Sequence, residues 1–305
     1  MLKRFATLII TLSICVGSVW AGDVEDAEAA MQKKDYATAL KKYKNAAMKN
    51  DAYAQAQIGA IYGYGLGVIK DYAEAVRWYK LSATQGYADA QFNLGAMYDN
   101  GQGVLQDYAE AVRLYKLAAA QGSANAQYNL GFMYRHGQGV ERDYAEALRW
   151  YKLAAAQGFS NGQYNFGNMI YTGEGVVQDY SEAMRWFKLA AAQGLVQAQY
   201  NIAVMYANGQ GVAQDFAEAV RWYKLAAAQN YASAQYNLGL MYAQGQGVVQ
   251  NYIRAHMWFN IAAVSGEKKA VQNRDIAASN MTTEQIGLAQ RLAKECQARN
   301  YKNCD

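Results

Sequence analysis

Few residues of this chain are of types that carry out chemistry, and their spacing argues against a catalytic or metal centre. The sequence holds three Cys and two His in 305 residues. His136 and His256 lie far apart, and no cysteine or carboxylate pair stands at metal-ligand spacing around either. A Gly-x-Ser-x-Gly elbow and a usable Cys/His pair are also missing from the sequence. We therefore predict no metal, no cofactor and no enzymatic activity.

Glycine-rich loops raise the question of phosphate binding. The pattern Gly-x-Gly-Val recurs at Gly65, Gly101, Gly137, Gly173, Gly209 and Gly245. A phosphate-binding loop would also need a third glycine, a preceding strand and a lysine directly after the last glycine, and these loops lack that combination. Most of the loops instead lead into an Asp that begins a helix, and its carboxylate would repel a phosphate there. We interpret these glycines as turn formers.

Two cysteines near the end of the chain are candidates for a disulfide. Cys296 and Cys304 are eight positions apart. On one continuous helix their Cα atoms would be about 12 Å apart, which is too far for a bridge. A bridge requires the helix to end near Asn300 so that the tail folds back. We favour this disulfide as a clamp on the C-terminal cap, with two free thiols as the alternative.

The first 21 residues have the features of a signal peptide. Lys3 and Arg4 precede an apolar stretch that runs to Trp20, and Ala21 offers a cleavage site. An uncleaved anchor is an alternative, although the stretch is shorter than the ~20 residues that span a membrane. A lipoprotein site at Cys15 is a weaker one, because bulky Ile14 precedes it. Cleavage would reduce the formal charge from +4 to +2 by removing two basic residues. We expect an exported chain, periplasmic or secreted, without stable membrane insertion and without nucleic-acid binding.

The remaining sequence repeats every 36 residues without insertions. Asp35-Tyr36 recurs as Asp71-Tyr72, Asp107-Tyr108, Asp143-Tyr144, Asp179-Tyr180, Asp215-Phe216 and Asn251-Tyr252. Each repeat predicts two helices. Asp71 is a suitable N-cap, Glu74 completes an acidic capping box, and Gly86 ends the first helix. The second helix starts at about Ala88, and a recurring glycine within it, Gly95 in this repeat, indicates close helix–helix approach.

Stacked helix pairs of this kind predict an all-α fold, a right-handed α-solenoid with a concave and a convex side. A chain of 305 residues with no Pro and 40 aromatic residues fits helices joined by glycine turns. We expect a signal peptide over 1–21, an N-terminal capping helix pair over 22–50, the repeat array over 51–266, and C-terminal capping helices with a tail over 267–305.

The repeat template resembles the Sel1-like repeat family. The match runs as Ala-x-x-x-Leu-Gly-x-Met-Tyr-x-x-Gly-x-Gly-Val-x-x-Asp-Tyr-x-x-Ala, continued to the stop glycine, and is read from Ala90 to Gly122 with Leu114 at a tryptophan position. It covers about residues 35–266. Residues 24–49 are more similar to a tetratricopeptide helix pair, and residues 256–285 resemble the terminal unit and capping helix of bacterial members. The resemblance implies a tetratricopeptide-like helical fold and an adaptor that holds other proteins.

Columns that vary between repeats are candidates for contact with a partner. The helices that start near Ala88 and at its equivalents carry an aromatic residue and then two variable positions. We expect a concave groove there, formed by Phe132, Arg135, Asn168, Tyr171, Val204 and Leu240. The preceding aromatic column is expected to pack between repeats and consists of Phe92, Tyr128, Tyr164, Tyr200 and Tyr236. The tryptophan column, which includes Trp78 and Trp186, is interpreted as inter-repeat core.

Our leading hypothesis is an exported, non-enzymatic scaffold that binds a protein or peptide on its concave face and acts on an envelope complex or a host partner. The alternative is a module that binds peptidoglycan or exopolysaccharide, which would show exposed aromatic residues beside carboxylates or amides. A minor alternative is weak β-lactam hydrolysis, known for cysteine-rich relatives whose repeats carry Cys pairs that this chain lacks. The oligomeric state stays open.

Overall fold

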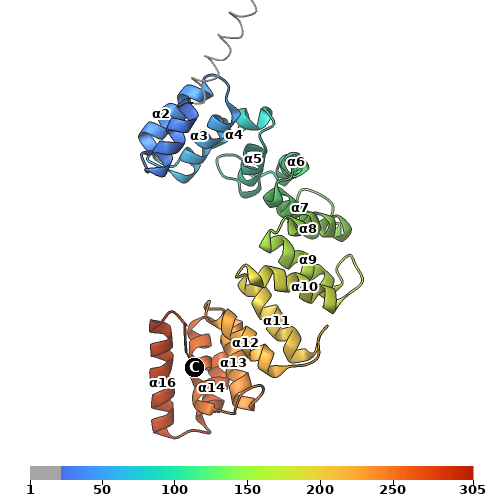
Figure 1. Ribbon diagram of the computed structural model, residues 1–305, viewed down its shortest axis with the longest axis vertical. Coiled ribbons are helices and arrows are strands. Elements are labelled where there is room, and N and C mark those ends of the chain that lie inside the picture. The colour runs from blue at the N-terminus through green and yellow to red at the C-terminus, as the bar shows by residue number, and fades with distance from the viewer. Residues whose placement is uncertain (1–21, 305) are drawn as a thin grey trace, which may run out of the picture. The chain divides into compact units, whose positions relative to one another are not determined.

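The protein is described by a computed structural model that covers residues 22–304. The predicted signal peptide therefore lies outside the described residues. Across the described range the chain forms helices, turns and bends, with no strand. None of the helices in this range is both long and apolar enough to cross a membrane. The fold is an all-α solenoid of tandem helix-turn-helix repeats, as the 36-residue period predicts (Figure 1).

The chain divides into two compact bodies, an N-terminal body that ends at Trp150 and a C-terminal body that begins at Tyr151. In the N-terminal body, residues 22–32 are helical and are followed by α2 (Tyr36–Ala47), α3 (Ala52–Tyr64), α4 (Tyr72–Thr84), α5 (Ala88–Asn100), α6 (Tyr108–Ala120) and α7 (Ala124–His136). Helix α8 (Tyr144–Ala156) contains the division. The C-terminal body continues with α9 (Ser160–Thr172), α10 (Tyr180–Ala192), α11 (Val196–Asn208), α12 (Phe216–Ala227), α13 (Ala232–Gln244), α14 (Tyr252–Val264), α15 (Lys268–Ala278) and α16 (Thr283–Ala298).

Aspartate N-caps begin the helices of the Asp-Tyr column, as predicted. In α4 the Asp71 carboxylate accepts a hydrogen bond from the backbone N–H of Glu74 at 2.9 Å. The predicted second half of the capping box is wrong. The backbone N–H of Asp71 donates to the carbonyl of Tyr62 at 3.0 Å, so it is no longer available to the Glu74 side chain. That carboxylate instead accepts from Arg77 and from Trp78.

The two glycines of each loop have different roles. Gly101 follows α5 in the left-handed conformation, at φ 65°, and ends that helix. Gly103 is also left-handed, at φ 71°, and a Cβ atom there would lie 2.3 Å from the carbonyl oxygen of Tyr72. The second glycine thus allows the loop to lie directly against the first turn of the helix one repeat earlier.

Close helix packing explains the glycine inside each second helix. A Cβ atom on Gly95 would lie 2.9 Å from the ring of Tyr115, which is fully buried. The same relation joins Gly59 to Tyr79 and Gly239 to Phe259. The predicted close approach is therefore confirmed, and the atom that requires it is an aromatic ring of the following helix.

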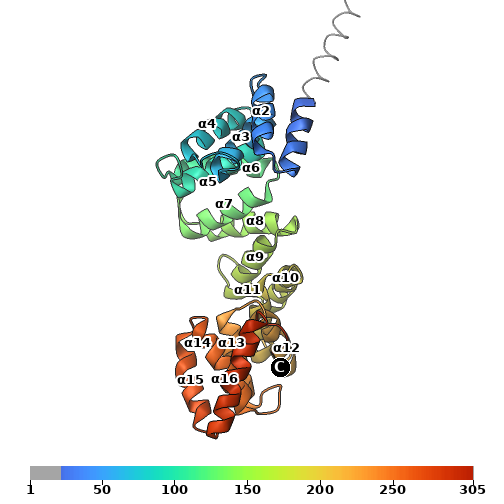
Figure 2. The ribbon, with the colours of Figure 1, turned by 90° about the vertical axis from the view of Figure 1, so that its left-hand side faces the viewer.

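The C-terminal body ends in a small helical cap with a disulfide. Helix α14 packs against both α15 and α16, which Figure 2 shows beside it. Thr282 and Gln285 form a capping box at the start of α16. The helix ends at Ala298, and Asn300 and Tyr301 adopt left-handed conformations that turn the tail back. Cys296 and Cys304 are bonded, with their Cα atoms 5.0 Å apart.

A candidate side-chain pocket on the face of α3 and α5

The residues predicted to form a groove differ in exposure. Phe132 is 41% exposed, and its ring centroid lies 4.3 Å from that of His136. Arg135 and Asn168 are half-buried. Val204 and Leu240 are half-buried as well, and they pack against the core of the C-terminal body. Phe132 is thus the member of the predicted set that the structure presents most openly.

Tyr171 is half-buried and makes contacts within the solenoid. Its hydroxyl donates to Gln210 Oε1 at 2.9 Å, and its ring centroid lies 5.2 Å from that of Tyr180 and 6.1 Å from that of Phe187. The side chain therefore packs against α10 and the loop that follows α11, because an aromatic ring there gains apolar contacts and a hydrogen bond.

The aromatic column preceding the variable positions packs between repeats, as expected. Ring centroids are 5.8 Å apart for Phe92 and Tyr115 and 5.7 Å apart for Tyr164 and Phe187. The next two pairs, Tyr200 with Tyr223 and Tyr236 with Phe259, repeat this geometry. The tryptophan column is only half-buried, apart from Trp258, which is 2% exposed.

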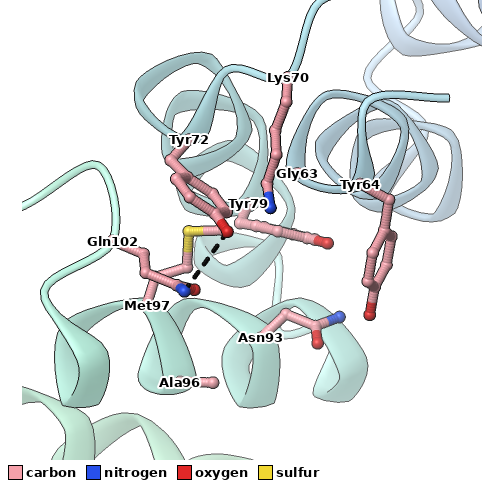
Figure 3. A pocket seen from close by; sticks show the side chains of 9 residues that line it. All are labelled: Gly63, Tyr64, Lys70, Tyr72, Tyr79, Asn93, Ala96, Met97 and Gln102. Atoms are coloured by element: carbon pink, nitrogen blue, oxygen red, sulfur yellow. Dashed lines mark hydrogen bonds between the residues drawn. The ribbon is translucent and has the colours of Figure 1, made fainter. Parts of the chain in front are cut away.

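A pocket opens in the N-terminal body beside the variable columns of α3 and α5 (Figure 3). Its volume is about 260 Å³. Helix α3 contributes Gly63 and Tyr64, and α4 contributes Tyr72 and Tyr79. The residues from α5 are Asn93, Ala96 and Met97. The complete lining is Gly63, Tyr64, Lys70, Tyr72, Tyr79, Asn93, Ala96, Met97 and Gln102. Two of the smallest side chains in the variable columns, Gly63 and Ala96, leave this space open.

The pocket combines an apolar wall with a polar rim. Met97 and the buried ring of Tyr79 supply apolar surface, and burial raises the pKa of Tyr79 far above its usual value, so its hydroxyl stays protonated. Lys70 Nζ lies 4.4 Å from the ring centroid of Tyr72, whose hydroxyl accepts from Gln102 Nε2 at 3.4 Å. Lys70 is the charged member of the lining, so the pocket suits a neutral or an anionic group.

Three repeats further on, the equivalent place is occupied by a side chain of the protein itself. Gly63 corresponds to Tyr171 in the 36-residue register, while Tyr72, Tyr79 and Gln102 correspond to Tyr180, Phe187 and Gln210. Tyr171 contacts all three of these equivalents. The fold therefore accommodates a phenol ring at this position wherever the residue at the Gly63 place supplies one.

Comparison with known proteins follows the same repeats. The family model for the Sel1 repeat matches residues 52–87, 88–123, 124–159, 160–195, 196–231 and 232–266. This chain belongs to the Sel1 repeat family. The matched residues include the helices from α3 to the end of α14 and every residue that lines the pocket.

Two solved Sel1 structures are similar over most of the chain. A Sel1 repeat protein from Oxalobacter formigenes is 32% identical with a TM-score of 0.71, and the match covers 79% of this chain and 96% of that one. The protein c5321, described as a protective antigen present in uropathogenic Escherichia coli strains, is 29% identical with a TM-score of 0.61. That match covers 93% of this chain and 70% of c5321. No curated protein matches the sequence.

A buried glutamine column in the Sel1 repeats escaped the sequence analysis. Gln91 Nε2 donates to the carbonyl of Ala83 at 3.3 Å, and its Oε1 accepts from Gln121 Nε2 at 2.8 Å. The pattern recurs in both bodies through the buried members Gln55, Gln163 and Gln199. The signal in the sequence is the constant glutamine at 36-residue spacing. It is easily overlooked because glutamine is usually exposed.

The pocket was also missed by sequence analysis. Large side chains in the variable columns indicate a partner surface, but the pocket opens where those columns carry the small residues Gly63 and Ala96. A search for the smallest residues in each variable column would have found it. Among the residues that the structure describes, no group of three or more His, Cys, Asp or Glu side chains could hold a metal ion.

Proposed function

We propose that this Sel1 repeat protein is a scaffold that binds a protein or peptide segment across the face of α3 and α5, with one aromatic side chain of the partner in the Gly63 pocket. The observation that supports this is Tyr171, which fills the equivalent place with a phenol ring. A tyrosine from a partner would contact Tyr72 and Tyr79 and donate its hydroxyl to Gln102 Oε1. Tyrosine is a frequent anchor at protein interfaces because it combines a large apolar area with a hydrogen-bonding tip.

The wider contact surface that we propose includes Phe132 in the same body, which is exposed and aromatic. Arg135 is proposed as a secondary contact of the same body, because half-buried side chains can still offer an edge to a ligand. Asn168, Val204 and Leu240 are proposed separately as contacts of the C-terminal body by itself. Tyr171 is omitted from this set because its ring contacts Phe187 and its hydroxyl bonds Gln210.

We also propose that the protein works outside the cytoplasm, in the periplasm or after secretion, as a non-enzymatic part of an envelope complex or of a contact with a host protein. The disulfide between Cys296 and Cys304 supports this location, since such bonds persist in oxidising compartments.

The test is a peptide-display selection on the full mature chain, followed by affinity measurement with the selected peptides. Gly63→Tyr recreates the Tyr171 arrangement and fills the pocket. Gly63→Ala is its matched control, because a Cβ atom there meets only ordinary contacts, the nearest being Ala75 Cβ at 3.6 Å. We expect peptides rich in aromatic residues that bind the wild type and Gly63→Ala equally and bind Gly63→Tyr at least about tenfold more weakly. Equal binding to Gly63→Tyr would contradict the proposal.

Glycan binding is retained as a second candidate because of one observation. Tyr64 is 73% exposed and lies in the pocket with the amide side chains of Asn93 and Gln102 (Figure 3). An exposed ring beside amides is a suitable surface for stacking and hydrogen bonding of a sugar. Titration of chitooligosaccharides against labelled protein tests this candidate. Binding that is lost in Tyr64→Ala and retained in Gly63→Tyr would favour the glycan over the peptide.

A further inference from the structure

Residues of α4, α5 and α6, which follow one another in the N-terminal body (Figure 1), line a second pocket. Its volume is about 460 Å³, within the range of roughly 300–1,000 Å³ that ligand pockets occupy. Leu117 provides open apolar surface, and Leu94 and Leu114 lie behind it in the core at 4% and 2% exposed. The charged residues of the lining are Lys80 from α4 and Glu110 and Arg113 from α6. Leu117 is 42% exposed, so the apolar wall reaches the surface.

This pocket lies beside the one Sel1 repeat that lacks a tryptophan in the tryptophan column. Leu114 occupies the column that elsewhere holds Trp78, Trp150, Trp186, Trp222 and Trp258. Trp78 and Trp150 pack against the buried clusters that precede them in the chain, over residues 27–61 and 111–133. In the repeat of α10, the ring of Trp186 lies 5.0 Å from that of Phe166 in an edge-to-face arrangement. Phe166 corresponds to Leu94, so the pocket carries two leucines where that repeat carries two aromatic rings.

The charged pair beside the pocket also differs in its hydrogen bonding. In α4, the indole N–H of Trp78 donates to Glu74 Oε1 at 2.8 Å, and Arg77 donates to Glu74 Oε2. Glu182 likewise divides its two oxygens between Trp186 and Arg185. In α6 both oxygens of Glu110 accept from Arg113, at 2.7 and 2.8 Å. Arg113 thus takes the oxygen that the repeats of α4 and α10 give to an indole. Arg149 likewise bonds both oxygens of Glu146 beside Trp150, so Glu–indole bonding is found in some of the tryptophan-bearing repeats and not in others.

We infer that this pocket binds the side chain of a tryptophan supplied by a partner protein. The indole ring would lie against Leu94, Leu114 and Leu117, and its N–H would donate to Glu110 Oε1. Arg113 would keep its hydrogen bond to Glu110 Oε2, as Arg77 does beside Trp78. The partner would thereby complete the arrangement that the repeats of α4 and α10 complete with Trp78 and Trp186. This site is separate from the Gly63 pocket and does not depend on the function proposed for it.

The hydrogen bond makes the pocket selective among aromatic groups. A phenylalanine side chain has no N–H for Glu110, so it would gain the apolar contacts without the hydrogen bond. Tryptophan offers both a large apolar surface and one donor, and it is among the residues that contribute most at protein interfaces.

The test uses N-acetyl-tryptophanamide and its N-methylindole analogue as probes, followed by amide chemical shifts of the full mature chain. We expect the tryptophan probe to bind in roughly the millimolar range and to shift resonances of α4, α5 and α6. The N-methyl probe should bind about five- to tenfold more weakly, because it cannot donate to Glu110. Leu114→Trp should abolish binding of both probes, since it fills the pocket.

Two further variants make the outcome decisive. Leu105→Trp adds a tryptophan on a loop residue that is 91% exposed, so probe binding should be unchanged. Glu110→Ala should remove the difference between the two probes while the N-methyl probe still binds. Shifts that do not map to these three helices would overturn the inference. It would equally be overturned if folded Leu114→Trp bound the probes as wild type does, or if Glu110→Ala kept the preference for the N–H.

Discussion

At the residue scale, the last buried glutamine of the column lacks the partner that its equivalents have. Gln235 is fully buried, and its Oε1 has no hydrogen-bond partner. In four earlier repeats this oxygen accepts from a glutamine thirty residues later, as with Gln229 and Gln199. The position thirty residues after Gln235 is Ser265, which is too short and instead donates to Asn230 Oδ1 at 2.9 Å.

Ser265→Gln is therefore expected to stabilise the protein. The new amide would reach Gln235 Oε1 and satisfy a buried acceptor, worth about 1 kcal/mol and a rise in the melting temperature of about 2–4 °C. Thermal unfolding followed by circular dichroism measures this effect. Ser265→Ala is the control, which should not raise the melting temperature because it removes the bond to Asn230 and supplies none to Gln235. A variant no more stable than wild type would show that the column does not act in this way.

His256 makes the stability depend on pH. It is 3% exposed, and its Nδ1 has no hydrogen-bond partner. Burial lowers the pKa of His256 below its ordinary value, and the positive charge of Arg274 lowers the pKa further. The carboxylate of Asp275 opposes this shift. A pKa below that of the unfolded chain means that the unfolded state takes up a proton first as pH falls. The contribution is thus complete above about pH 6.5 and is lost below it, at no more than about 1.4 kcal/mol per pH unit.

We accordingly expect His256→Leu to flatten the pH dependence of stability between about pH 6.5 and 5. Denaturant unfolding of wild type and variant at a series of pH values provides the measurement, with the difference between them as the quantity of interest. His136→Leu is the matched control, since that histidine is exposed. Parallel pH profiles for wild type and His256→Leu would refute the assignment.

At the element scale, the turns of each repeat depend on glycine for two separable reasons. Gly122 is left-handed, at φ 90°, with no atom within 4 Å of a Cβ position, so substitution there strains the backbone alone. Gly103 is left-handed and also lies against the carbonyl of Tyr72. Its substitution therefore strains the backbone and separates the loop from α4.

Gly122→Ala should cost about 1–2 kcal/mol of stability, whereas Gly103→Ala should cost clearly more, at least about 3 kcal/mol. The comparison is made by denaturant unfolding of the two variants beside wild type. Hydrogen exchange adds a local readout, because Gly103→Ala should also lower protection in the first turn of α4. Equal losses in the two variants would mean that the close approach has no energetic weight.

At the scale of the whole molecule, the disulfide holds the tail against the end of the C-terminal body. Arg254 donates to the carbonyl of Cys304 at 2.7 Å, and Tyr301 packs with Cys304 against the core that includes Trp258. The bond closes a short loop, for which the entropic contribution is about 2–3 kcal/mol.

Reduction should consequently lower the melting temperature of the C-terminal body by about 5–10 °C. Thermal scans with and without dithiothreitol measure the shift, and hydrogen exchange should locate the lost protection in α14 and α16. Cys304→Ser is expected to melt like the reduced wild type and to be insensitive to dithiothreitol. Unchanged melting on reduction would show that the hydrogen bonds and apolar contacts hold the tail without the bond.

Much of the fold followed from the sequence because the repeat is a local structure. Aspartate caps, glycine stops and the spacing of buried residues act within a few residues of one another, and 36-residue copies multiply the signal. The aromatic packing of Phe92 and its equivalents was predicted for the same reason. The capping-box prediction failed because the backbone N–H of Asp71 is taken by Tyr62, a residue of the preceding helix.

The sequence by itself determined that this chain is a helical solenoid of Sel1 repeats, because its period records which side chains must be buried together. Only the tertiary structure decided where the pockets open. Gly63 with Ala96, and Leu114 with Leu94, stand on neighbouring helices, so whether their small or aliphatic side chains leave space depends on how those helices pack. Tyr171 and Trp186 fill the same places in other repeats, and that correspondence became visible only once the rings had positions.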